Sequence, residues 1–154
     1  MIRGIKYEIQ GTGIHNILRP LARLSITRKL TWIHDPNQYE DCNLDTLEEF
    51  FTEESYSGEK IISLMQEPNY ILFIKLAAFW GRTDIPITQI NTYEDFKKSP
   101  YLLVCLVWDC DTAEIYCKES QIANDLYEAA IQEGCVNVTY ITDENDTRRR
   151  LNVL

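Results

Sequence analysis

Two segments of the chain, residues 70–80 and 101–108, are apolar at almost every position. A strand with one face in water alternates apolar and polar residues, so an unbroken apolar run of this length indicates a strand that is covered on both faces. Both runs are shorter than the roughly 20 apolar residues that a membrane-spanning helix needs, and the first contains Lys75. We therefore expect both segments to be central strands of one sheet that has helices over at least one face.

The segments around these two strands predict the rest of an α+β fold. Strand patterns occupy residues 2–9, 29–33, 113–118 and 136–141, and Asp35-Pro36-Asn37 is expected to end the second of them. Helix patterns occupy residues 14–21, 44–54, 57–65, 92–98 and 120–133, and Thr142 or Asp143 is placed to cap one more. We expect a single α+β domain over residues 1–154, with a mixed, mainly antiparallel sheet of about six strands and helices packed on it.

The charge of the chain is distributed unevenly along its length. The net charge is −9, yet residues 1–34 sum to +5 and residues 35–60 to −8. An acidic surface repels phosphate backbones, so the balance argues against nucleic-acid binding, whereas a basic protein partner would be attracted to it. The same surface also serves solubility without any partner, and that alternative stays open.

The most acidic stretch coincides with the predicted helix at residues 44–54. Leu44, Leu47 and Phe51 recur at helical spacing and are expected to turn inward, which leaves acidic side chains on the outer arc. We predict that these acidic side chains bind the partner: Asp45, Glu48, Glu49 and Glu53. In the alternative, their charge is neutralised within the fold by basic residues elsewhere in the chain: Arg19, Arg23, Arg28, Lys29 and residues 148–150.

The cysteines indicate a reducing environment and no metal cage. Their number, five, is odd, they form no Cys-x-x-Cys pair, and only two histidines accompany them. The first residues also lack the apolar core of a secretory signal, so we expect free thiols, a cytoplasmic location and no membrane association.

Two places in the sequence would suit an enzyme instead. His34 adjoins Asp35 and would act as a general base, because histidine titrates near neutral pH. Asp109 and Asp111 would offer oxygen ligands to a divalent cation, although aspartate is also an ordinary turn residue. Neither place is accompanied by a nucleophile motif or a third acid at a fixed offset, so we assign no catalytic residue, cofactor or metal.

Lys75 interrupts the apolar run of residues 70–80, and a buried ammonium must be paired or lose its proton. We therefore expect Lys75 to reach an edge of the sheet or to pair with an acid.

Three stretches resemble a family of short proteins from low-GC Gram-positive bacteria that is classed as a domain of unknown function. The stretches are Arg3-Gly4-Ile5 with Glu8-Ile9, residues 93–96 through 115–118, and residues 140–148. The resemblance extends along the whole chain and implies a bacterial cytoplasmic protein, with no activity, ligand or site residue to transfer.

Two functional hypotheses follow from the sequence. The first is a non-enzymatic module that binds a protein, in the manner of a small acidic inhibitor or immunity protein. The alternative is a small enzyme with a site near His34 or at the turn of Asp109 and Asp111. A concave pocket that contains either place would favour the enzyme, and an open convex acidic surface would favour the binding module.

Overall fold

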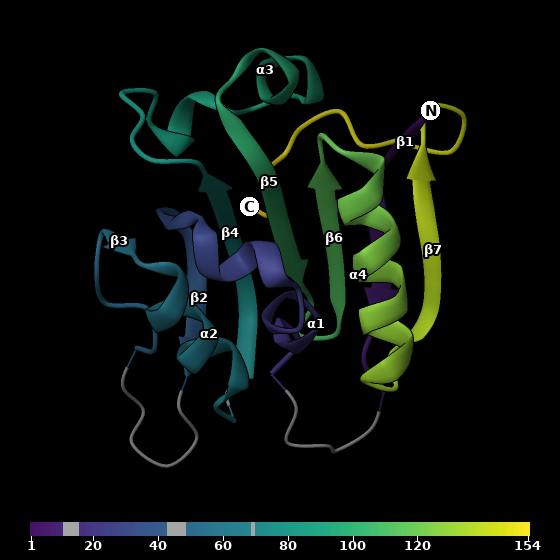
Figure 1. The fold of residues 1–154 in the computed structure, drawn as a ribbon, viewed down its shortest axis with the longest axis horizontal. Coiled ribbons are helices and arrows are strands. Elements are labelled where there is room, and N and C mark those ends of the chain that lie inside the picture. The colour runs from purple at the N-terminus through teal and green to yellow at the C-terminus, as the bar shows by residue number, and fades with distance from the viewer. Residues whose placement is uncertain (11–15, 43–48, 69) are drawn as a thin grey trace.

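An antiparallel sheet organises the computed structural model, which describes residues 1–10, 16–42, 49–68 and 70–154 (Figure 1). Within these residues the sheet has seven strands in the order β3-β2-β4-β5-β6-β1-β7. The strands are β1 (Ile2–Glu8), β2 (Thr31–Cys42), β3 (Ser55–Tyr56), β4 (Tyr70–Phe79), β5 (Tyr101–Trp108), β6 (Thr112–Cys117) and β7 (Val136–Thr142). The predicted α+β class and the sheet are confirmed.

The two apolar segments form β4 and β5, which lie next to each other at the centre of the sheet, as predicted. Leu76 pairs with Cys105 in their antiparallel register. Ile74 and Leu76 point into one hydrophobic core, while Ala77 and Phe79 point into a second core on the opposite face. The strands are apolar on both faces because each face carries its own core.

Among the described residues, three of the four α-helices cover the first face. These are α1 (Arg19–Ala22), α2 (Gly58–Gln66) and α4 (Ser120–Gln132), which lie in front of the sheet in Figure 1. The Ser57 side chain caps α2 by accepting a hydrogen bond from the Lys60 amide. None of the described helices is long and apolar enough to cross a membrane.

The second face is covered by α3 (Tyr93–Lys98), the short 3₁₀ helix η2 (Ile87–Gln89) and the C-terminal segment. Thr92 and Asp95 form the predicted capping box at the start of α3. A second 3₁₀ helix, η1 (Ser25–Lys29), leads into β2.

The C-terminal segment, residues 143–154, corrects the prediction of a helix capped by Thr142 or Asp143. After one turn, in which the Asp146 amide bonds to the Thr142 carbonyl, the chain is not helical and crosses the second face of the sheet (Figure 1). The amides of Val153 and Leu154 bond to the Gln38 side chain on β2, at the far side from β7. Burial of Leu151 in the second core favours this path over a helix. We call residues 143–154 the C-terminal strap.

The second strand is longer than predicted. β2 does not end at Asp35 but continues to Cys42, and its pairing shifts from His34 with Leu76 to Tyr39 with Ile74. Residues 35–38 therefore stand opposite the single residue Lys75 and form a bulge, in which the Asp35 carboxylate accepts the Asn37 amide. The turn-forming residues Asp35-Pro36-Asn37 therefore produce a bulge in the strand and do not end it.

The predicted acidic helix is wrong in the part that the structure describes. Residues 49–54 are not helical, and residues 43–48, with Asp45 and Glu48, lie outside the described residues. Phe51 is buried as predicted. The two-residue strand β3 was not predicted, because two residues are too few to show a periodicity. The predicted helix at 14–21 is described only from residue 16, and α1 begins at Arg19.

Candidate functional site

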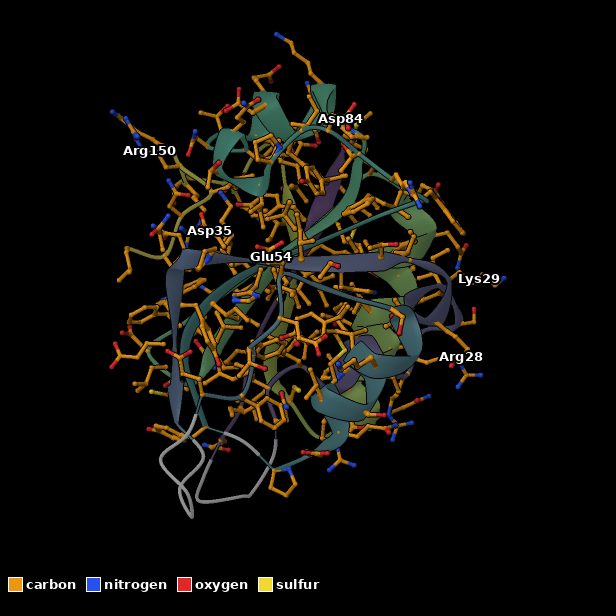
Figure 2. The ribbon with its side chains drawn as sticks, turned by 90° about the vertical axis from the view of Figure 1, so that its left-hand side faces the viewer. Arg28, Lys29, Asp35, Glu54, Asp84 and Arg150 are labelled. Carbon is orange, nitrogen blue, oxygen red and sulfur yellow. The ribbon has the colours of Figure 1, made fainter. Side chains whose placement is uncertain are left out.

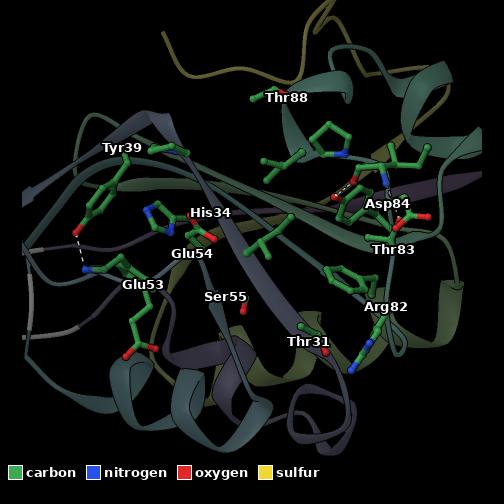
Figure 3. A pocket seen from close by; sticks show the side chains of 18 of the residues that line it. Thr31, His34, Tyr39, Glu53, Glu54, Ser55, Arg82, Thr83, Asp84 and Thr88 are labelled. Carbon is green, nitrogen blue, oxygen red and sulfur yellow. Dashed lines mark hydrogen bonds between the residues drawn. The ribbon is translucent and has the colours of Figure 1, made fainter.

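A groove with a cavity volume of about 1200 Å³ lies at the β2 side of the sheet. One wall is the segment 49–55, the other is the segment 81–88 that follows β4, and side chains of β2 lie between them (Figure 3). In Figure 3, Glu53, Glu54 and Ser55 belong to the first wall and Arg82, Thr83 and Asp84 to the second. Most of the lining residues of both walls are exposed, so the groove is open to water.

Tyrosine hydroxyl groups hold the first wall in place. The Tyr39 hydroxyl accepts hydrogen bonds from the amides of Phe50 and Phe51 at 3.1 and 2.9 Å. The Tyr56 hydroxyl accepts the Glu53 amide at 2.7 Å. The buried Phe51 ring packs edge-on against the rings of both tyrosines. These contacts fix a backbone without regular secondary structure and leave its carboxylates in solvent.

The second wall is attached to the sheet by Tyr101 of β5. The Tyr101 hydroxyl donates to the Ile85 carbonyl, and its ring packs edge-on against Phe79. Burial raises the pKa of Tyr101 to about 12, so the phenol keeps its proton and remains a donor at neutral pH. Ile87 is buried beneath this wall, whereas Arg82 and Asp84 are exposed.

Carboxylates outnumber cations in the groove. Glu49, Glu53 and Glu54 come from the first wall and Asp84 from the second, and Arg82 is the one arginine or lysine in the described lining. Glu53 pairs with Lys60 of α2 at the groove margin. Within the described parts of the chain, no ion pair involves Glu49, Glu54 or Asp84. The first wall therefore has a net negative charge, whereas on the second wall Asp84 and Arg82 balance in formal charge.

Three of the seven basic residues expected in the alternative interpretation pair with acids outside the groove. Arg19 and Arg23 both pair with Glu133, and Arg148 pairs with Glu114. Arg28, Lys29 and Arg150 project outward at the margins of the molecule in Figure 2, away from Glu54. These residues do not neutralise the described acidic wall, and sequence reasoning missed Lys60, which does so for Glu53.

The structure places His34 in the same groove as the acidic wall. Its ring lies 5.1 Å from the Tyr39 ring and 5.9 Å from the Phe51 ring, measured between centroids. Asp35 does not join it, because successive residues of a strand point to opposite faces. Asp35 is buried, and its carboxylate bonds to the Asn37 amide within the bulge.

The turn of Asp109 and Asp111 lies away from this groove. It joins β5 and β6 as a loop of residues 109–111, one residue shorter than predicted, because Thr112 already pairs with Trp108. Asp109 and Cys110 adopt positive φ angles of 54° and 66°, and Asp111 accepts the Thr112 hydroxyl. Across the described ranges, no group of three or more His, Cys, Asp or Glu side chains is arranged to hold a metal.

Lys75 neither reaches an edge of the sheet nor forms an ion pair within the described residues, which corrects the expectation from sequence. It is fully buried on β4, where its ammonium donates to the Ile90 carbonyl and to the Asn152 side chain. Burial lowers its pKa from 10.5 to about 8, although the negative charges of Asp35 and Asp95 oppose the shift.

The four cysteines whose side chains the structure describes are free thiols. Cys105 and Cys117 are buried, and burial raises the pKa of both well above the ordinary value. Cys135 is half-buried, and its pKa rises to about 11. Thiols with raised pKa values are poor nucleophiles at neutral pH, so the groove remains the candidate site.

Comparison with known proteins adds a family and one relative. A family model described as "Protein of unknown function (DUF2691)" matches residues 2–152. The uncharacterised protein YncE of Bacillus subtilis (strain 168) is 34% identical over 160 residues, which cover 99% of this chain and 100% of that protein. No solved structure matches the chain.

Proposed function

The chain belongs to the DUF2691 family of proteins of unknown function, and from this premise we propose that it is a binding protein whose groove takes a basic segment of a protein partner. The resemblance noted in the sequence is confirmed by the family match. Membership brings no activity with it, so the proposal depends on the groove alone.

The observation that carries the proposal is a set of carboxylates on the two walls without an ion-pair partner among the described residues. These are Glu49, Glu54 and Asp84, and Arg82 is the one arginine or lysine among the described residues that line the cavity. An arginine or lysine entering the groove would meet carboxylates from both sides, and this complementarity would speed association and select against acidic partners.

The size and surface of the groove support a peptide segment as the ligand. Its volume of about 1200 Å³ exceeds the range of roughly 300–1,000 Å³ that is usual for small-molecule sites. The rings of Tyr39 and Phe51 also line it, and aromatic faces attract guanidinium and ammonium groups. A basic side chain would therefore gain from both the charge and the rings.

A small enzyme that uses His34 as its base is the second candidate, and the position of His34 in the groove supports it. The groove is also concave, which by the criterion stated from the sequence favours an enzyme, but its openness to water weighs against one. Catalytic sites exclude water from the reacting groups, whereas most of the residues that line these walls are exposed. We therefore favour binding.

The cytoplasmic location stays a prediction from the sequence.

The test is calorimetric titration with a short capped peptide of alternating arginine and glycine, at low and at high salt. A groove variant, Glu49→Gln with Glu54→Gln and Asp84→Asn, removes three carboxylates. The matched control, Glu119→Gln with Glu128→Gln and Glu144→Gln, removes three exposed carboxylates from outside the groove lining. The two variants have the same net charge, so they separate the groove from the overall charge of the protein.

We expect salt-sensitive binding to the natural protein and to the control, and an affinity at least about tenfold lower for the groove variant. A version of the peptide with glutamate in place of arginine should not bind. Equal losses in both variants would assign the binding to net charge, and the absence of binding to the natural protein would refute the proposal.

A further inference from the structure

We propose that the last residues of the chain, 152–154, act as a releasable latch that holds the part of β2 between the two walls of the groove in its binding shape. The latch is the end of the C-terminal strap. Its role in ligand affinity rests on the proposed function of the groove, whereas the latch itself rests on contacts that are independent of any ligand.

The strap is firmly anchored up to Leu151. The Leu151 side chain is 1% exposed, and its amide bonds to the Asn91 carbonyl at 2.8 Å. The Arg148 guanidinium bonds to Glu114 at 2.8 Å and lies 4.7 Å from the Trp108 ring centroid. It also donates to the Asn152 carbonyl at 2.9 Å. This part of the strap belongs to the second core.

Beyond Leu151 the strap is held by hydrogen bonds to four side chains and by Val153, which is half-buried against the second core. Arg148 donates to the Asn152 carbonyl, as described above, and the Asn152 side-chain nitrogen lies 3.4 Å from the Asn91 side-chain oxygen. Lys75 donates to the Asn152 side-chain oxygen at 2.9 Å. The Gln38 side-chain oxygen accepts the amides of Val153 and Leu154 at 2.8 and 2.9 Å. Leu154 is 68% exposed and adds little burial. Water can replace the bonds to Gln38 at a small net cost, and water that enters when Asn152 leaves would solvate the Lys75 ammonium, so the latch can open while Leu151 stays in the core.

The two residues that hold the latch, Lys75 and Gln38, both lie at the β2 bulge. Residues 35–38 stand opposite Lys75, and they lack regular pairing with β4 between His34 and Tyr39. Their shape therefore depends on side-chain bonds, namely Asp35 to the Asn37 amide and Gln38 to the latch. A bulge held only by its internal bond from Asp35 to Asn37 would be more mobile than one that the latch also holds through Gln38.

The bulge in turn shapes the groove. Pro36 lies within it and Tyr39 directly follows it, and both residues line the groove. The Tyr39 hydroxyl also holds the amides of Phe50 and Phe51 in the acidic wall. Release of the latch would thus loosen β2 between the walls directly and the wall of residues 49–55 through Tyr39. A ligand would then have to order these residues on binding, which lowers its affinity.

The experiment compares four forms of the full chain with the natural protein: deletion of residues 152–154, Gln38→Ala, Gln38→Glu and Thr147→Ala. Gln38→Glu keeps a side-chain acceptor for the two amides and should preserve the latch. Thr147 is an exposed residue of the strap outside the latch and serves as the control. Hydrogen exchange followed by mass spectrometry reports on the mobility of the bulge. Acetylation of Lys75 by a water-soluble acylating reagent reports on whether residues 152–154 still shield its ammonium group from solvent.

We expect the deletion and Gln38→Ala to speed exchange over residues 35–39 by about tenfold, while α4 keeps its protection. The deletion should also make Lys75 reactive. Both changes should lower the affinity for the arginine peptide by roughly three- to tenfold. Gln38→Glu and Thr147→Ala should behave like the natural protein in exchange and in Lys75 reactivity.

Unchanged exchange at residues 35–39 in both the deletion and Gln38→Ala would refute the latch, even if the arginine peptide binds. Faster exchange with no peptide binding in any form would support the latch and refute the proposed function. Loss of α4 protection on removal of residues 152–154 would show that they belong to the core, and this result would also overturn the proposal.

Discussion

The side-chain oxygen of Asn152 lies 2.9 Å from the ammonium nitrogen of Lys75, which joins the end of the chain to the centre of the sheet. The other acceptor of Lys75 is the Ile90 carbonyl, so the buried charge is held by neutral oxygens. Burial lowers the pKa of Lys75 to about 8 because the nearby carboxylates of Asp35 and Asp95 offset desolvation only in part.

This pKa predicts how stability depends on pH. The folded protein loses the Lys75 proton near pH 8, whereas the unfolded chain keeps it up to 10.5, so the unfolded state binds more protons between these values. The contribution of Lys75 to the free energy of unfolding should therefore rise with pH in this window, by about 1 kcal/mol from pH 8 to pH 9.

Urea unfolding of the natural protein and of Lys75→Met at pH 7, 8 and 9 measures this contribution as a difference. The difference matters because burial raises the pKa of Tyr7, Tyr101 and Cys105, and groups with raised pKa values make stability fall as pH increases. Those groups are present in both proteins, so their contributions to the free energy of unfolding cancel in the difference. Parallel pH profiles for the two proteins would contradict a lowered pKa at Lys75.

Gly4→Ala should destabilise the fold strongly. Gly4 of β1 pairs with Tyr116 of β6, and a Cβ atom at this position would overlap the Ile115 carbonyl oxygen. The backbone of a paired strand cannot move away cheaply, so we expect a loss of at least about 3 kcal/mol in denaturant unfolding. Thr139→Ala, an exposed change on the neighbouring strand β7, should stay within about 0.5 kcal/mol. Similar values for the two variants would show that β1 and β6 are spaced differently.

Ile74→Ala should remove part of the first hydrophobic core. Ile74 is fully buried on the central strand β4, so its truncation should lower the free energy of unfolding by roughly 2–4 kcal/mol. The exposed change Ile131→Ala on α4 is a suitable control, because its side chain is 50% exposed. A loss below about 1 kcal/mol for Ile74→Ala would be inconsistent with a core position.

Tyr39→Phe should loosen the acidic wall of the groove. The change leaves the amides of Phe50 and Phe51 without the hydroxyl that accepts both of them, which should cost about 1–3 kcal/mol in thermal or urea unfolding. Hydrogen exchange over residues 49–55 should also accelerate. Tyr140→Phe is the control, because among the described residues that hydroxyl bonds only to the exposed Asn124 side chain. Unchanged exchange at residues 49–55 would mean that other contacts hold the wall.

The thiols should separate by reactivity. All five cysteines should titrate with a thiol reagent in denaturant under anaerobic conditions. In the folded protein Cys105 and Cys117 should react far more slowly than the half-buried Cys110, because they are buried and have raised pKa values. Fewer than five thiols in fresh material, or bound zinc, would reveal a bond or a metal site.

Local patterns predicted much of the fold and part of the candidate site. The apolar runs of β4 and β5 and the cap of α3 by Thr92 and Asp95 are visible in sequence because each depends on residues close together in the chain. Charge counting likewise singled out Glu49 and Glu53, which the structure places on one wall of the groove. Nothing local indicated Arg82 and Asp84 on the other wall, since about 30 positions separate the walls and only the sheet order brings them together.

The sequence by itself determined the fold class, the two central strands and the excess of negative charge before β4, because hydrophobic periodicity and composition record which residues leave water. The tertiary structure alone decided that β2 continues through the bulge, that Lys75 is buried without an ion pair within the described residues, and that the strap crosses the second face. Those features depend on strand register and on bonds between distant residues, such as Gln38 and Val153, which lie 115 positions apart. A periodicity identifies the buried face of an element but not the element that will cover it.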